Sequence, residues 1–141
     1  MRRVSLGFLL GVVVLVSAFI SAGASAEQNG GNPEARKLKN PVASTPESIK
    51  AGEANFQKFC RFCHGADAKG NGPQAPKGTH PPDLTDAKWD NGSSDGEIFA
   101  SIRDGVGPKF DMRAFKSKLT EEQIWEVVTY IRSVGPQQPT R

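Results

Sequence analysis

The chain has 141 residues, with 18 basic and 15 acidic side chains and a formal net charge of +3. This length indicates a single domain, and no basic run indicates nucleic-acid binding. Two cysteines and two histidines are too few for a zinc finger, and neither a hydrolytic triad nor a phosphate-binding glycine fingerprint is present. The composition therefore gives no indication of an enzyme of these classes.

Residues 1–26 have the pattern of a secretory signal peptide. Two arginines near the start are followed by the uncharged apolar stretch 6–20 and by the small-residue cleavage site Ala-Ser-Ala at 24–26. We therefore expect export to the periplasm, with Glu27 as the first mature residue and a mature formal charge of +1. The uncharged run 4–26 is long enough to span a bilayer, so an uncleaved membrane anchor facing the periplasm is the alternative.

A first helix is expected to follow a lead-in. Residues 27–44 lack hydrophobic periodicity, which predicts a flexible segment. Thr45-Pro46 then has the residue types of an N-cap and a first helical position. Gly52, Phe56 and Cys60 share the apolar face of the predicted helix. A glycine inside a helix costs about 1 kcal/mol relative to alanine, so Gly52 is either merely tolerated or marks a close helix crossing.

The next stretch, Cys60-Arg61-Phe62-Cys63-His64, has the C-x-x-C-H spacing of covalent haem attachment. Thioether bonds from Cys60 and Cys63 would hold two edge substituents of the macrocycle, which places His64 beneath the iron as proximal ligand. The alternatives are a disulfide between the cysteines, a zinc site with His64 and His80, and a thioredoxin-like dithiol. Further zinc ligands and a preceding strand are missing. The pattern predicts one covalently bound haem c.

Two more helices and two long loops are predicted downstream. Residues 65–82 are rich in glycine and proline, which indicates a long loop. The capping box at 94–97 begins a short middle helix that ends at Gly105, and a second loop containing Met112 follows. The capping box at 120–123 begins the last helix, which Gly135-Pro136 ends. We therefore expect a mono-haem domain at 45–135 and a tail at 136–141.

Three motifs together resemble the class I c-type cytochromes, which are small exported electron carriers with one haem. They are CRFCHG at 60–65 after a helix with Gly52 and Phe56, Gly72-Pro73 nine residues beyond His64, and Met112-Arg113-Ala114-Phe115 before the last helix. The resemblance covers residues 45–134. It implies an all-α class I cytochrome c fold, in which the N- and C-terminal helices cross near Trp125 and Tyr130, with a short middle helix and long loops wrapped around the haem.

The resemblance also implies roles for individual residues. Met112 would be the sixth iron ligand, with His80 as the alternative; the prolines after His80 restrict its reach. The carbonyl of Pro73 would accept a hydrogen bond from Nδ1–H of the proximal histidine. Trp89 would donate its indole N–H to a haem propionate, or else only fill the core. The chain departs from many relatives at Arg113, where they have a proline, which leaves the loop around Met112 less constrained.

An iron with His64 and Met112 as ligands would change oxidation state without gaining or losing a ligand, which suits an electron carrier. We therefore expect a monomeric electron-transfer protein without enzymatic activity, with redox proteins such as a dehydrogenase or terminal oxidase as partners. Membrane contact is expected only if the leader is retained. The alternatives are a haem enzyme or gas-binding protein with an open sixth position, and a cytochrome subunit of a dehydrogenase or oxidase complex.

Overall fold

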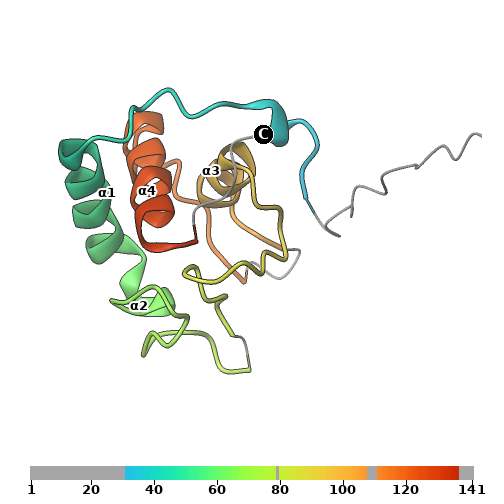
Figure 1. Cartoon of the computed structure of the whole chain (residues 1–141). Helices are drawn as coiled ribbons and strands as arrows, with labels where there is room; N and C mark the ends of the chain where they lie inside the picture. The colour runs from blue at the N-terminus through green and yellow to red at the C-terminus, as the bar shows by residue number, and fades with distance from the viewer. Residues whose placement is uncertain (1–30, 79, 108–110, 137–141) are drawn as a thin grey trace, which may run out of the picture.

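The computed structural model describes residues 31–136 except 79 and 108–110, and within these ranges the chain is helical (Figure 1). The elements, in chain order, are a 3₁₀ turn η1 (Ala35–Lys37) and four α-helices: α1 (Pro46–Phe59), α2 (Arg61–His64), α3 (Asp95–Asp104) and α4 (Glu121–Val134). The described part has no strand, only one isolated antiparallel bridge between Val106 and Met112. The predicted all-α class is confirmed.

The predicted leader 1–26 and tail residues 137–141 lie outside the described residues. Among the helices that the structure describes, none combines the length and apolar character needed to cross a membrane.

The three longer helices begin at the caps that the sequence predicts. The side chains of Thr45, Ser94 and Thr120 each accept a hydrogen bond from the backbone N–H three residues later. In each case the side chain of that third residue also interacts with the N-cap backbone, so two otherwise unpaired N–H groups are satisfied. These local bonds explain why the start of each helix can be predicted from sequence.

Helices α1 and α4 lie against each other at very close range (Figure 1). A β-carbon at Gly52 would lie 2.0 Å from the carbonyl oxygen of Glu126, so only glycine fits at this point of α1. The rings of Phe56 and Tyr130 contact each other with centroids 5.2 Å apart. The close crossing of the first and last helices is therefore confirmed, and Gly52 is more than a tolerated residue.

Helix α3 packs on another part of α4 and completes the core. Phe99 of α3 stacks on Trp125 of α4, with ring centroids 4.0 Å apart and an interplanar angle of 13°. The largest completely buried side chains come from all three helices; they are Phe56, Phe99, Ile124, Val127 and Val128. This three-helix core supports α2 and the long loops around it.

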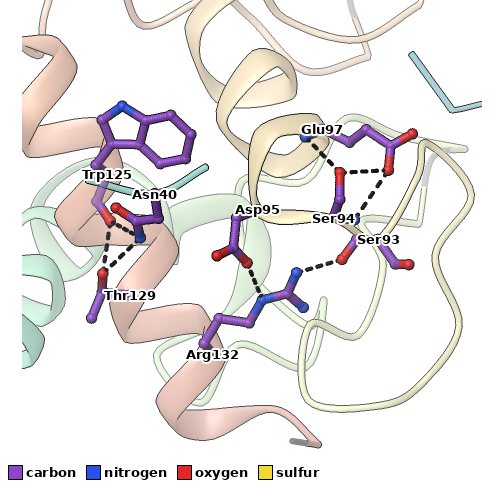
Figure 2. A network of polar contacts seen from close by, with 8 residues as sticks. All are labelled: Asn40, Ser93, Ser94, Asp95, Glu97, Trp125, Thr129 and Arg132. Carbon is purple, nitrogen blue, oxygen red and sulfur yellow. Dashed lines mark hydrogen bonds and ion pairs between the residues drawn. The ribbon is translucent and has the colours of Figure 1, made fainter. Parts of the chain in front are cut away.

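Residues 31–44, which we call the strap, lie in the region expected to be a flexible lead-in, and they make contacts with α3 and α4. The strap contacts α3 through η1, where Ala35 is buried and Arg36 Nε donates to Glu97 Oε1 at 3.1 Å. Farther along, Asn40 Nδ2 donates to Thr129 Oγ1 of α4 at 3.0 Å (Figure 2). These hydrogen bonds join residues that are 61 and 89 positions apart in the chain. Hydrophobic periodicity in the sequence therefore does not indicate them.

Candidate functional site

The C-x-x-C-H sequence forms one short turn of helix directly after α1. Cys60 closes α1 and begins α2, and His64 N donates to Cys60 O at 3.0 Å. Cys60 and His64 are buried, whereas Cys63 is half-buried. Because Cys60 continues the buried face of α1, the core that fixes α1 also fixes the two cysteines and the histidine. The motif therefore sits on a rigid support, as a covalent attachment site requires.

Both cysteines are free thiols in this structure. Burial, assisted by the neighbouring Cys63, raises the pKa of the Cys60 thiol to about 12, so it is uncharged at neutral pH. Cys63 Sγ lies 3.5 Å from the carbonyl oxygen of Gln74. Among the described residues no group of three or more histidine, cysteine or acidic side chains could hold a metal ion, which gives the zinc alternative no support.

The loop after His64 folds back onto α2. Gly72 N donates to Cys63 O at 3.0 Å, and Gln74 N donates to Phe62 O at 2.7 Å. A β-carbon at Gly72 would lie 2.4 Å from the carbonyl carbon of Cys63, so a glycine is needed where the two backbones meet. Backbone hydrogen bonds thus attach the loop to the motif, and the two backbones can approach because Gly72 has no side chain.

The imidazole ring of His64 is buried directly after the second cysteine. Nδ1 has no hydrogen-bond partner among the described residues. Burial lowers the pKa of His64, and the backbone of Pro82 partly opposes that shift, so the ring is neutral and able to bind iron. Pro73, whose carbonyl is expected to accept from Nδ1–H, is exposed, as is Pro82, and the role of the Pro73 carbonyl stays a prediction.

Trp89 is half-buried and packs against the hydrophobic core. Its indole Nε1 is buried and has no hydrogen-bond partner in the described part of the chain. An indole N–H can only donate, and leaving a buried donor unpaired costs about 1–3 kcal/mol. The arrangement therefore calls for an acceptor that the described polypeptide does not supply.

Met112 lies in a loop that backbone bonds hold to the end of α3. Val106 N donates to Met112 O at 2.9 Å, and Phe115 N donates to Ile102 O at 3.0 Å. The Met112 side chain is half-buried against the core, whereas His80 is exposed. These bonds constrain the loop although Arg113, itself exposed, replaces the proline of many relatives.

The family model described as cytochrome c oxidase, cbb3-type, subunit III matches residues 47–131. The chain belongs to this family. It is a class I c-type cytochrome whose function is electron transfer and whose cofactor is covalently bound haem c. The match runs from the first turn of α1 to the last turn of α4, so it contains every element that builds the site.

Individual relatives agree with this assignment. Subunit CcoP of a cbb3-type cytochrome c oxidase from Rhodobacter capsulatus is 36% identical to the cytochrome, over 68% of this chain and 35% of the relative. The cytochrome thus spans about a third of the length of the curated relatives it matches. Cytochrome cL from Methylophaga aminisulfidivorans is 30% identical, with a TM-score of 0.54 over 70% of this chain and 58% of that one. A chain of the Kuenenia stuttgartiensis reducing HAO-like protein complex is 25% identical, with a TM-score of 0.61 over 70% and 50%.

The site of the cytochrome fits its haem. Cys60 and Cys63 offer two thiols on one turn, and the neutral His64 ring lies directly after them. The unpaired N–H of Trp89 matches the acceptor oxygens of a haem propionate. A haem would also supply apolar surface to a small domain whose core is otherwise limited.

Proposed function

We propose that this cytochrome carries single electrons between redox proteins in the periplasm, with Cys60 and Cys63 holding the haem and His64 and Met112 binding its iron. The observation that supports this assignment most is the buried indole Nε1–H of Trp89, which lacks an acceptor in the described chain. A bound haem would supply the one-electron couple, ferric and ferrous iron, that a carrier between donor and acceptor proteins requires.

The chain's own residues keep the site unchanged between the two oxidation states. Thioethers from Cys60 and Cys63 would hold the macrocycle on α2, and the Cys63–Gly72 backbone bond holds the following loop in place. The bridge between Val106 and Met112 holds the backbone of the second loop, which would limit the movement of Met112 as its iron changes oxidation state. Little has to reorganise when an electron passes, which suits a carrier.

Because Met112 is assigned as the sixth iron ligand, we also propose that the cytochrome is not an enzyme. A methionine in the sixth position leaves no open site for peroxide or a diatomic gas. We therefore expect that the ferrous wild-type protein does not bind carbon monoxide and that its spectrum stays unchanged under the gas. Rapid formation of a carbon monoxide complex would favour the gas-binding or haem-enzyme alternative.

We also propose that the partner is a terminal oxidase, and the similarity to CcoP supports this choice. Co-purification from the native membrane and periplasmic fractions tests it. Recovery with oxidase subunits from the membrane fraction is the expected result. Recovery as a monomer from the periplasmic fraction alone would favour a free carrier.

Export with cleavage after residue 26 remains part of the proposal. Intact mass of the native protein tests it, because removal of the leader leaves Glu27 as the first residue. A product that keeps residues 1–26 and stays in the membrane fraction would instead make the leader an anchor for the domain.

A further inference from the structure

Trp89 lies in an irregular loop, yet its ring is contacted by a residue of the last helix, α4. Residues 85–93 contain no helix or strand that could fix the indole. The guanidinium carbon of Arg132, on the last turn of α4, lies 5.7 Å from the centroid of the Trp89 ring. A cation at this distance from an indole ring is attracted to it.

Arg132 is itself fixed by two partners at the start of α3, as Figure 2 shows. Its Nε donates to Asp95 Oδ1 at 2.7 Å, and its Nη2 donates to the backbone carbonyl of Ser93. The Arg132 side chain is only 21% exposed. A guanidinium bound at two points and partly buried has little freedom, so it presents a fixed surface to the indole.

We propose that Arg132 is a positioning residue that aims the indole N–H of Trp89 at the haem propionate and thereby raises the reduction potential. The reasoning is electrostatic. A donor on a propionate lowers its effective negative charge, and less negative charge near the iron disfavours the ferric state. Arg132 acts through the orientation of Trp89, which it contacts, and through the loop end at Ser93, which it binds. This inference rests on the proposed haem site.

The test uses the complete haem-loaded protein and two measurements. The first is hydrogen exchange of the indole N–H groups, followed by nitrogen-resolved NMR of the ferrous state, with Trp125 as internal reference. The second is the reduction potential. In Arg132→Gln we expect the Trp89 N–H to exchange about fivefold to tenfold faster, as for loss of one hydrogen bond, with a lower potential. Trp89→Phe should lower the potential in the same direction.

A double variant separates positioning from the simple loss of a charge. If Arg132 acts through Trp89, Arg132→Gln should shift the potential no further when Trp89→Phe is already present. Fully additive shifts, or unchanged indole exchange in Arg132→Gln, would overturn the inference. Asp95→Asn keeps Arg132 but removes the negative charge that pairs with it, so it should give a smaller change in the same direction even if Arg132→Gln does not fold; no change would count against the inference.

Arg103→Gln is the matched control. Arg103 pairs with Asp104 at 2.8 Å, and its guanidinium carbon lies 5.2 Å from the Phe99 ring, so the same kinds of contact are lost. Trp89 exchange should not change in this variant; equal acceleration would mean general loosening and overturn the inference. Failure of the proposed function would look different, because wild-type protein would then lack covalent haem and Trp89→Phe would not alter any haem potential.

Discussion

Gly52 of α1 and the backbone of Glu126 in α4 lie so close that a β-carbon on Gly52 would be 2.0 Å from the Glu126 carbonyl oxygen. The same β-carbon would be 2.9 Å from Cβ of Tyr130, whose ring packs on Phe56. Neither a backbone carbonyl nor a Cβ atom can move without moving α4 itself. The distance between α1, which leads into the haem motif, and α4 is therefore set by a residue with no side chain.

Substitution of Gly52 by alanine should separate the helices and destabilise the protein. Alanine gains about 1 kcal/mol in helix propensity, but overpacking at a buried position costs about 1–3 kcal/mol, and more where backbone must move. We expect a net loss of about 1–2 kcal/mol in the free energy of unfolding, measured by denaturant titration of the haem-loaded protein.

The control for this prediction is Lys50→Ala on the same helix. Lys50 is exposed, so its variant should stay within about 0.5 kcal/mol of the wild type. A Gly52→Ala variant as stable as the wild type, or more stable as propensity alone would predict, would contradict the close crossing.

Glu97 should make stability depend on pH in the acid range. Its carboxylate is 2% exposed and lies 3.0 Å from Arg36 Nη2 in the strap. Burial raises the pKa of Glu97, but the hydrogen bonds from Ser94 and the hydrogen bond and charge of Arg36 outweigh it, so the pKa lies below its ordinary value of 4.5. A carboxyl whose pKa is lowered by folding stabilises the fold above the unfolded-state pKa, and this contribution is lost as the pH falls through the folded-state pKa.

The measurement compares unfolding of the wild type and Glu97→Gln across pH. At neutral pH the variant should be less stable by about 1–3 kcal/mol, because charge-assisted hydrogen bonds are lost in a buried site. This gap should shrink as the pH drops below about 4.5. Glu34→Gln, which breaks only an exposed pair with Lys37, should show no such dependence. A gap that stays constant down to low pH would be inconsistent with the ionised Glu97–Arg36 pair.

Much of the helical framework could be predicted because its signals are local. Thr45, Ser94 and Thr120 each bond to a backbone group three residues away, so the sequence around each cap contains the whole interaction. The C-x-x-C-H motif is likewise five consecutive residues. The position of Gly52 in a helix indicated a crossing, although not that Glu126 is the partner.

The features that sequence reasoning missed depend on residues distant in the chain. The strap was expected to be flexible because residues 27–44 lack hydrophobic periodicity, and its contact between Asn40 and Thr129 joins residues 89 positions apart. Pro73 was named because Gly72-Pro73 resembles a family motif; the backbone of Pro82, which affects the pKa of His64, was not singled out, because only the path of the loop brings it near the ring. Arg132 was not singled out at all, since its contacts with Ser93 and Asp95 join the two ends of a 39-residue span.

Loss of the Met112 side chain should open the iron. Met112→Ala should lower the potential, because a soft thioether favours ferrous iron, and should let carbon monoxide bind the ferrous form. Visible spectroscopy and a redox titration measure both effects. His80 is exposed, so His80→Ala should alter neither; loss of the weak long-wavelength ferric Fe–S band in His80→Ala, and its retention in Met112→Ala, would reverse the assignment.

Covalent attachment of one haem through Cys60 and Cys63 is the central claim, and intact mass spectrometry of the denatured protein tests it most directly. The account predicts one mass, that of the polypeptide plus a single haem, with both thioethers on the peptide containing Cys60 and Cys63. Cys63→Ala should keep at most one thioether. A denatured polypeptide without haem, or a haem that acid-acetone extracts from the wild type, would contradict the account.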